Sequence, residues 1–409
     1  MPVNSSLVKN LFAPYSKTTF LSEYWPDQAL SVHGNLDRLP DYLRSDALRS
    51  FAKLAARYHG NITFGNAATG NRTAIAKNVP ATLLRQMGLS LYLPDLAAYV
   101  PGTEEFLRGL ELELGAQPGT ARIGAFAAAV HNGVTSHFDA EEVISVQLEG
   151  EKRFYIAPMR EIPYPYGMQF GPGYASFDDL YPQIAAGIPK IDDTDFLCVE
   201  MRPGSVLFMP RGTWHRTEAT EESFSVSIIV RQPAPFETVL EQLRLSLLRD
   251  PNWRRPLYAA GRDSEMRTRL AALLEDLPRA SQTFSTDDIL NAALPDSARL
   301  ARLDETSWLQ RIPNAQLLLT PPQTGELWTG VVRISRFDGS DRDVLQLQIP
   351  PNMLPVLQWL AQQERPLRAG ALAQHFAALP FGQIKTILDV LVRADYLKLL
   401  RHVPLETDG

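Results

Sequence analysis

Residues 121 to 232 consist of short apolar runs, each closed by a turn signal. Glycine-containing pairs such as Asn132-Gly133, Glu149-Gly150 and Pro203-Gly204 supply the turns. The candidate strands are Ile123 to Val130, Val143 to Leu148, Lys152 to Ala157, Phe196 to Glu200, Ser205 to Met209 and Phe224 to Val230. Many short strands with Gly and Pro turns predict a sandwich or barrel, the group that includes jelly rolls and cupins.

The rest of the chain predicts further domains around this β core. With 409 residues, the protein is too long for one ordinary domain. Helical spacing of apolar residues is expected at 37–58, 103–115, 236–248, 264–277 and 286–294. We predict an N-terminal α/β region at 1–118 that completes the barrel, a β core at 119–235, a helical segment at 236–313 and a winged-helix-like domain at 314–409. A Pro- and Tyr-rich insertion at 160–195 is expected to be a loop that covers a site.

Composition and charge exclude several functional classes. The net charge is −6, which does not suggest a nucleic-acid coat or a polybasic membrane anchor. The single cysteine, Cys198, excludes an intrachain disulfide and a cysteine-based zinc site, and its apolar neighbours predict a buried side chain. No signal-peptide pattern and no stretch of roughly 18 apolar residues is found. We therefore predict a cytoplasmic protein that does not enter a membrane.

One small constellation of residues points to chemistry. His137 and Asp139 flank a phenylalanine, and in an extended chain residues i and i+2 point to the same side. His215 follows 78 residues later, beside the Arg211-Gly212 turn. Two neutral imidazoles and one carboxylate on one face leave other coordination positions open, which is the signature of non-haem Fe(II) oxygenases.

The segments around these residues resemble a known family. The run from His137 to Pro158 resembles the core of JmjC-type oxygenases, and is similar to the asparaginyl hydroxylase acting on the hypoxia-inducible factor and to the ribosomal oxygenases. The run from Arg202 to His215 resembles their distal segment, and Phe20 to Pro26 resembles the entry segment of cupin-like bacterial members. The resemblance covers roughly 20–235. It implies a double-stranded β-helix (a JmjC–cupin jelly roll) in which His137, Asp139 and His215 hold Fe(II), with 2-oxoglutarate as co-substrate and O2 as oxidant.

Two further residues are candidates for binding 2-oxoglutarate. In the family, a Lys or Arg at the position of Lys152 pairs with the distal carboxylate of 2-oxoglutarate, and strand alternation places Lys152, Phe154 and Ile156 on one face. The family also often places a hydroxyl near Thr135 that hydrogen-bonds the same carboxylate. In the asparaginyl hydroxylase this hydroxyl lies one position earlier.

The resemblance implies hydroxylation of an amino-acid side chain in a protein or peptide, with release of succinate and CO2. The ribosomal oxygenases share the order of barrel, dimerising helical segment and winged helix, so a homodimer is expected. From Gln316 to Gly409 there are nine Lys/Arg and nine Asp/Glu, which argues against a nucleic-acid partner. Three alternatives stay open: N-methyl-lysine or N-methyl-arginine demethylation, small-molecule hydroxylation, and a non-catalytic metal-binding cupin that regulates through its winged helix.

Overall fold

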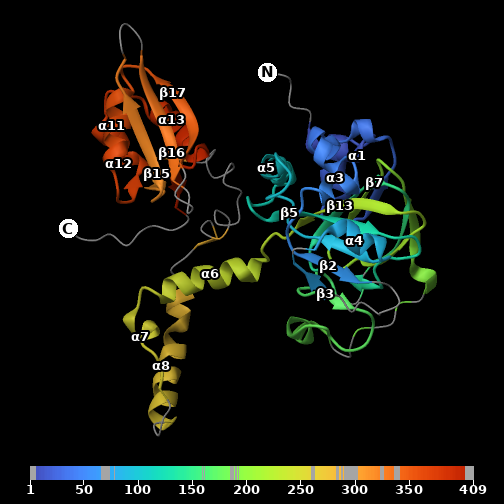
Figure 1. The fold of residues 1–409 in the computed structure, drawn as a ribbon. Coiled ribbons are helices and arrows are strands. Elements are labelled where there is room, and N and C mark those ends of the chain that lie inside the picture. Colours follow the sequence, from blue (N-terminus) through green and yellow to red (C-terminus); the bar gives the residue numbers. More distant parts are fainter. Residues whose placement is uncertain are drawn as a thin grey trace. The chain divides into compact units, whose positions relative to one another are not determined.

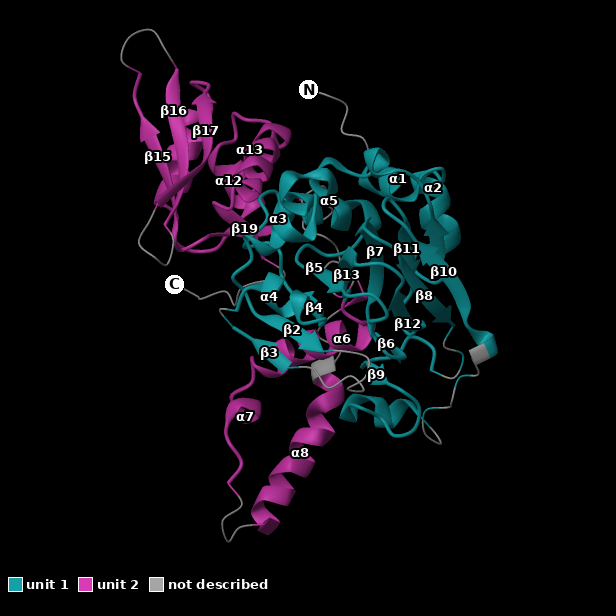
Figure 2. Ribbon diagram, turned by 45° about the vertical axis from the view of Figure 1, so that its right-hand side comes forward, with its two compact units in different colours: residues 1–232 teal, residues 233–409 magenta. Residues whose placement is uncertain are grey.

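The structure is a computed structural model of the full chain. It describes residues 6–65, 74–77, 79–158, 160, 162–184, 188, 191, 193–258, 263–281, 285–286, 289, 303–322, 327–335 and 341–400. The chain forms two compact units, Met1–Gln232 and Pro233–Gly409 (Figure 2). The expected helix at 286–294 lies almost wholly outside the described residues. Among the described helices, none has the length and apolar character needed to cross a membrane.

Two β-sheets build the first unit (Figure 1). In the described part, the larger sheet has the strand order β1 (Leu30–Val32), β11 (Val206–Met209), β7 (Glu142–Glu149), β13 (Ser223–Val230), β5 (Ala121–Ala128), β4 (Ser90–Leu93), β2 (Ile62–Gly65) and β3 (Ala74–Ala76). The smaller sheet has the order β10 (Leu197–Met201), β8 (Lys152–Ala157), β12 (Trp214–Ala219), β6 (His137–Phe138) and β9 (Gln169–Phe170). The strands expected between 121 and 232 are confirmed.

Both faces of the larger sheet are buried, against different partners. One face packs with the N-terminal helices in a large core that includes Ile144, Val146 and Phe208. The opposite face meets the smaller sheet through an apolar cluster of Val143, Phe154, Ile156, Val199, Met201, Leu207 and Met209. The cluster draws on β7 and β11 from one sheet and on β8 and β10 from the other, so the two sheets form a sandwich with a shared interior.

The helices of the first unit come mainly from the N-terminal region. They are α1 (Leu7–Phe12), α2 (Lys17–Thr19), a π-helical turn (Phe20–Tyr24), α3 (Phe51–Ala55), α4 (Ala81–Gln86) and α5 (Thr103–Leu114). The expected helix at 103–115 is confirmed by α5. The expected helix at 37–58 is wrong: the segment forms 3₁₀ turns at Leu36–Arg38, Asp41–Arg44 and Asp46–Leu48 before α3. Pro40 and Ser45 have ψ angles of 147° and 153°, which interrupt helical geometry.

Cys198 is exposed rather than buried. Along β10, Val199 and Met201 face the interior, so Cys198 and Glu200 face outward. Because β10 is the edge strand of the smaller sheet, its outer face stays open to solvent. The expected strand is present, but the expectation that Cys198 is buried was wrong. The buried side of β10 carries Val199 and Met201 instead.

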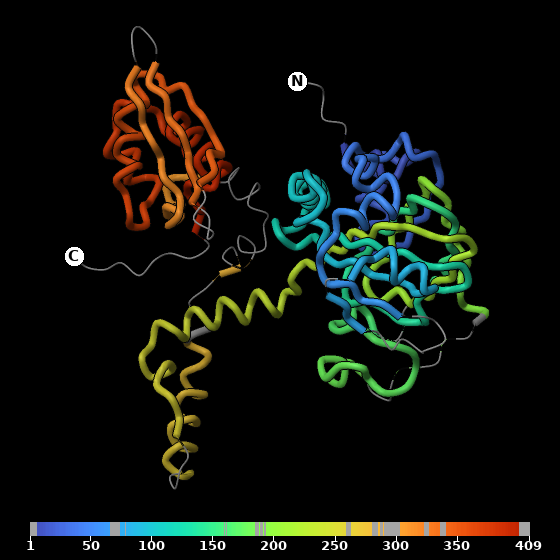
Figure 3. Tube along the Cα trace, viewed as in Figure 1, coloured from blue at the N-terminus to red at the C-terminus, as the bar shows by residue number. Residues whose placement is uncertain are grey.

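The insertion at 160–195 is anchored on the smaller sheet. It carries β9, which pairs with β6, and two 3₁₀ turns, Asp178–Gln183 and Asp193–Asp195. Leu180 and Ile162 from the insertion pack with Phe138 and Trp214 of the sheet in one buried cluster. The tube in Figure 3 shows this segment in green along the edge of the first unit.

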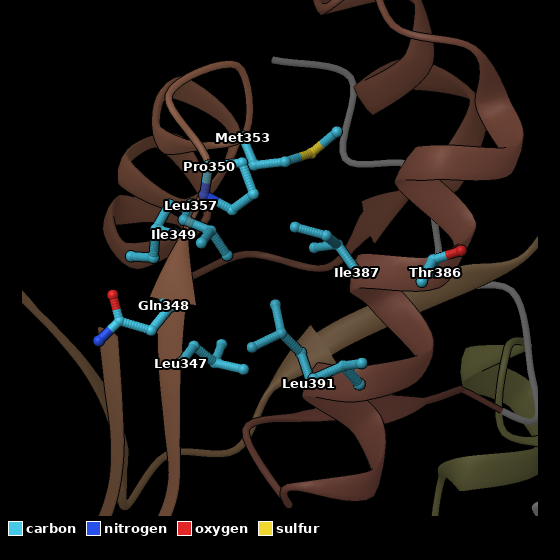
Figure 4. A pocket seen from close by; sticks show the side chains of 10 residues that line it. Leu347, Gln348, Ile349, Pro350, Met353, Leu357, Thr386, Ile387 and Leu391 are labelled. Atoms are coloured by element: carbon cyan, nitrogen blue, oxygen red, sulfur yellow. The ribbon is translucent and has the colours of Figure 1, made fainter. Parts of the chain in front are cut away.

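The second unit begins with helices α6 (Pro235–Leu247), α7 (Pro251–Arg254) and α8 (Asp263–Ser281), and α6 contacts α8. Its C-terminal part contains a sheet of β15 (Ala315–Thr320), β16 (Trp328–Ser335) and β17 (Asp341–Ile349) and a second sheet of β18 (Leu367–Arg368), β14 (Trp308–Arg311) and β19 (Leu397–Leu399). Helices α11 (Leu354–Gln362), α12 (Ala369–His375) and α13 (Phe381–Arg393) pack with them in one core. An apolar pocket lies between β17, α11 and α13 (Figure 4).

Candidate metal centre

Strand pairing brings the two histidines together from distant parts of the sequence. His215 of β12 lies directly opposite His137 of β6 in antiparallel register. Their ring centroids are 4.0 Å apart, and Asp139 follows β6 by one residue. One donor atom from each of His137, Asp139 and His215 lies within 4.8 Å of the other two. The structure thus brings together the three residues that the spacing singled out.

A glycine permits this close approach of the strands. A Cβ atom at Gly133 would lie 1.8 Å from the carbonyl oxygen of Thr217 in β12, which no side chain can tolerate. The adjacent backbone is bonded to the same residue, since the Thr217 amide donates to the Val134 carbonyl at 2.9 Å. The Asn132-Gly133 turn therefore closes tightly and aims the following residues, His137 and Asp139, at β12.

Each imidazole is fixed by the same backbone contact. Nδ1 of His137 donates to the carbonyl of Thr135 at 2.8 Å, and Nδ1 of His215 donates to the carbonyl of Thr213 at 2.9 Å. A carbonyl only accepts hydrogen bonds, so the proton of each neutral ring sits on Nδ1 and the lone pair on Nε2. Nε2 of His215 lies 3.8 Å from Oδ2 of Asp139. Both rings hold the tautomer that can coordinate a metal ion.

Electrostatics keep His215 uncharged. Burial, followed by the neighbouring His137 and Lys152, holds the pKa of the His215 imidazole well below its usual range. A neutral imidazole is a metal ligand, whereas a protonated one is not. Two neutral nitrogen donors and one carboxylate fit a divalent first-row metal ion, and three ligands on one side leave positions for exogenous ligands.

Lys152 lies in the shared interior of the sandwich. It alternates with Phe154 and Ile156 on the inward face of β8, as the sequence predicts. Its Nζ lies 4.9 Å from the ring centroid of Phe154 and 5.5 Å from that of Phe126. Burial lowers the pKa of Lys152 to about 8. In the part of the chain that the structure describes, no carboxylate pairs with this ammonium group.

Sequence reasoning missed the polar residues that surround Lys152. Ser225 of β13 is fully buried, and its Oγ lies 3.5 Å from the Lys152 Nζ. Ser145 Oγ and Gln147 Oε1 on β7 are buried and find no hydrogen-bond partner among the described residues. In strand β13, Ser225 and Ser227 alternate with Val226 and Ile228, which face the large core shared with the N-terminal helices. That alternation is a readable signal of a polar inward face.

Tyr92 is a second residue that the sequence did not single out. Its ring stacks on Phe126 at 4.5 Å and lies against Gly124, where an added Cβ would come within 2.6 Å of the ring. Burial raises the pKa of the Tyr92 hydroxyl, and the neighbouring Arg122 opposes this shift. Tyr92 lies in β4 of the N-terminal region, far in sequence from the segments that carry His137 and His215. Only the pairing of β4 with β5 brings it close to the candidate metal centre.

Thr135 holds its position near the site through its backbone. Its carbonyl is the acceptor that orients the His137 ring. The contact of its hydroxyl with 2-oxoglutarate stays a prediction. Ser225 is the hydroxyl-bearing side chain whose distance to Lys152 is within hydrogen-bonding range.

A buried ion pair joins the two segments that carry the candidate ligands. Arg211, which precedes β12, contacts Glu142 at the start of β7 through two bonds. One joins Nε to Oε1, and the other joins Nη2 to Oε2 at 2.9 Å. Both side chains are largely buried, with 15% and 7% of their surface exposed. The adjacent Gly212 amide donates to the Asp139 carbonyl at 2.8 Å. The pair thus fixes the loop before His215 against the segment after Asp139.

A family comparison matches the region that holds the three candidate ligands and Lys152. The model of the JmjC domain matches residues 117–237, a range that includes β5 to β13 and the three candidate ligands. Residues 117–237 of this chain form a JmjC domain. The two-sheet sandwich with its bounding helices is the JmjC–cupin core that the sequence predicts.

Curated relatives agree with this assignment. The chain is 26% identical over 306 residues to the uncharacterized protein YxbC of Bacillus subtilis. The alignment covers 71% of this chain and 92% of YxbC. The chain is also 24% identical over 225 residues to ribosomal oxygenase 2 of Rattus norvegicus. This alignment covers 52% of the chain and 44% of the relative. The chain is therefore related to the ribosomal oxygenases, although the match spans less than half of that relative's length.

Solved structures give a weaker match. The ribosomal oxygenase YcfD from Escherichia coli, solved in complex with cobalt and 2-oxoglutarate, aligns with a TM-score of 0.43 and 14% identity. The alignment covers 94% of the JmjC-domain protein and 98% of YcfD.

The Arg211–Glu142 pair is predicted to support metal binding without touching the metal. Replacing Arg211 by Gln leaves Glu142 buried and unpaired and releases the loop before His215, so we expect the affinity for Co(II) to fall about tenfold. Titration with Co(II), followed by its visible absorption, measures this. Arg122→Gln is the matched control, because Arg122 forms a more exposed pair with the adjacent Glu141. Equal Co(II) affinity in wild type and Arg211→Gln would contradict the role.

Proposed function

We propose that this protein is an Fe(II)- and 2-oxoglutarate-dependent dioxygenase that hydroxylates an amino-acid side chain in a protein or peptide substrate. The observation that carries the proposal is the combination of His137, Asp139 and His215 with the buried Lys152 in the same interior, where no carboxylate of the described residues pairs with it. A metal site alone is compatible with many activities. A metal site together with a buried cation selects a ligand that chelates the metal at one end and carries a carboxylate at the other.

The 2-oxoglutarate assignment rests on charge. Below about pH 8 the protonated Lys152 is a cation among aromatic rings, and holding it there without a counter-ion is costly. A carboxylate that reached Lys152 and the Ser225 hydroxyl would offset that cost through charge-assisted hydrogen bonds. The orphaned Ser145 Oγ adds another polar group in the same interior. The position of Lys152 next to His215, whose pKa it lowers, fits a small ligand that spans from the metal to the ammonium group.

The protein's own residues would divide the work in a defined way. His137, Asp139 and His215 would hold Fe(II), Lys152 with Ser225 would bind the distal carboxylate, and the apolar cluster between the sheets would exclude water. Bound Fe(II) and 2-oxoglutarate supply the oxidative chemistry, in which O2 is consumed and succinate and CO2 are released with the hydroxylated product. The chain contributes binding, orientation and a dry interior.

A protein substrate is favoured by the relatives and by the surface beside the site. One relative carries the name ribosomal oxygenase 2, and the insertion that follows β8 exposes several aromatic side chains, of which Phe170 lies in the strand paired with β6. Demethylation of an N-methylated side chain is the second candidate. It is favoured by the 24% identity over 250 residues to a protein of Drosophila willistoni named as a bifunctional lysine-specific demethylase and histidyl-hydroxylase. Formaldehyde release with methylated substrates separates the two.

The second unit fits a supporting role. Helices α6 and α8 expose apolar side chains at a spacing of four residues, with Phe236 and Leu240 on one and Leu270 and Leu274 on the other. We place a homodimer contact on these faces, which sedimentation equilibrium can measure. We further propose that the strands β14, β18 and β19 with α11 to α13 correspond to the expected winged-helix-like domain. Its last helix offers little to phosphates, because Arg393 already pairs with Asp389 at 2.8 Å.

Turnover of 2-oxoglutarate tests the proposed function. With Fe(II) and ascorbate, wild-type protein should form succinate slowly even without a peptide, and Asp139→Ala should form none above background, because the metal loses its carboxylate ligand. Succinate is quantified by mass spectrometry. Glu141→Gln, two residues further along, is the control and should keep most of the turnover. Succinate formation by Asp139→Ala at the wild-type rate would contradict the assignment, and absence of both turnover and 2-oxoglutarate binding in wild type would favour the non-catalytic cupin.

The ionisation of Lys152 predicts a pH dependence of co-substrate binding. The free protein holds this pKa at about 8, and a bound carboxylate raises it. Affinity for 2-oxoglutarate should therefore be constant below about pH 8 and fall above it by up to about tenfold per pH unit. Calorimetric titration of the Mn(II) form from pH 7 to 9 measures the profile. Lys152→Arg keeps its charge throughout this range and should give a flat profile; a flat profile for wild type would contradict the role of Lys152.

A further inference from the structure

The loop beside the metal centre exposes an unusual group of aromatic side chains. We name Tyr164, Phe170, Tyr174, Phe177 and Tyr181 the aromatic surface; their exposed fractions are 68%, 42%, 89%, 45% and 54%. Exposed large apolar side chains that cluster on one segment mark an interaction site. Tyrosine and phenylalanine are also the residue types enriched where proteins bind one another.

The loop that carries the aromatic surface is folded rather than extended. The buried side chain of Gln169 donates to the carbonyls of Gly171 and Tyr174 at 2.8 and 3.0 Å and accepts from the Ser176 amide at 2.8 Å. Gln183 bonds both backbone groups of Tyr166, at 2.9 and 2.6 Å. These contacts fold the segment that carries the exposed rings into a compact loop.

The aromatic surface begins at the metal centre itself. Phe170 of β9 lies opposite His137 in the pairing with β6, and the two rings stack with centroids 5.9 Å apart. The Gly171 amide donates to the Ser136 carbonyl at 2.9 Å. A chain bound along this loop would therefore pass directly beside a candidate metal ligand.

The charge of the same segment selects the kind of partner. Residues 160–195 contain two Lys/Arg and six Asp/Glu, a net charge of −4, while the whole chain carries −6. Asp178 and Asp179 are both exposed and lie between Phe177 and Tyr181. Negative charge next to exposed aromatic faces attracts cations and repels phosphates. Anionic lipid surfaces and nucleic acids are thus disfavoured, and a positively charged polypeptide fits.

The loop already shows such a contact within the chain. The guanidinium of Arg231 lies 5.5 Å from the ring centroid of Tyr166, and its Nη2 donates to the Tyr166 hydroxyl at 3.2 Å. One tyrosine of this segment therefore already holds an arginine through its ring and its hydroxyl group.

From these observations we infer that the aromatic surface, with Asp178 and Asp179, docks a Lys- or Arg-rich segment of the protein substrate and guides it past Phe170 to the metal. This inference rests on the proposed function, because it names the substrate class of the same site. We further expect that substrate recognition depends on basic residues that flank the target residue and bind the loop outside the sandwich.

Binding of designed peptides to the full chain tests the inference. The probes are three fluorescein-labelled peptides of equal length, identical except that spaced positions carry Lys and Arg, Gln, or Glu. Anisotropy is measured with the Mn(II) and 2-oxoglutarate form in the absence of O2. The basic peptide should bind at least about tenfold more tightly than the neutral one, and raising the salt concentration should reduce this difference.

Two sets of variants separate charge from aromatic contact. Asp178→Asn with Asp179→Asn should weaken binding of the basic peptide about fivefold and leave the neutral peptide unchanged. Tyr174→Ser with Tyr181→Ser should weaken it by a similar factor. The matched control is Glu104→Gln with Glu105→Gln, two exposed carboxylates on α5, which removes the same net charge elsewhere and should change binding less than about twofold.

The outcomes distinguish the two proposals. Both loop variants should keep the peptide-independent succinate formation of wild type, since none of their residues contacts the candidate ligands. If turnover is intact but the three peptides bind alike, or if the α5 control weakens binding as much as the loop variants, the docking inference is wrong and the proposed function stands. If a labelled single-stranded nucleic acid binds the loop more tightly than the basic peptide, the inference is also overturned. If wild type fails to turn over 2-oxoglutarate, the proposed function fails independently of the peptides.

Discussion

The antiparallel register between β6 and β12 is the constraint on which the site depends. It places His215 opposite His137, and with Asp139 one residue beyond β6 it collects three donor atoms from segments far apart in sequence. In a sheet, a shift by one residue turns every side chain to the other face. A slip here would move one imidazole out of the interior. The tight turn at Gly133 and the hydrogen bonds between Val134 and Thr217, one of them accepted by the Thr217 hydroxyl, hold this register.

The interior between the sheets combines two environments with different tasks. The apolar cluster around Phe154 and Met201 joins the sheets and excludes water. Beside it, Lys152, Ser225, Ser145 and Gln147 place polar groups where the dielectric is low. Buried polar groups that lack partners are costly in a structural core. Ser145 Oγ and Gln147 Oε1 have no hydrogen-bond partner among the described residues, and a polar ligand of the kind proposed above would offset this cost.

The sequence alone predicted the local features and missed those set by tertiary pairing. Alternation along β8 located Lys152 on the inward face, and the i, i+2 spacing put His137 and Asp139 on one side of the chain, because both depend on local geometry. His215 was assigned to the same candidate site from its turn context and the family resemblance, and the pairing of β12 with β6 brings it there. Tyr92 was missed because its place is set by the pairing of β4 with β5. Ser225 was missed because a buried serine resembles any strand serine until its partner is known. Cys198 was misplaced because the run that contains it does not reveal which face of an edge strand is buried.

The most direct test of the account is an anaerobic titration of the Fe(II)-loaded protein with 2-oxoglutarate, followed by the visible charge-transfer absorption of the chelate. We expect a band that saturates at about one 2-oxoglutarate per chain, is absent in His215→Ala, and needs much more 2-oxoglutarate in Lys152→Ala. A wild-type protein that binds Fe(II) but develops no band, or a Lys152→Ala protein that titrates like wild type, would contradict the claim that this sandwich binds Fe(II) and 2-oxoglutarate together.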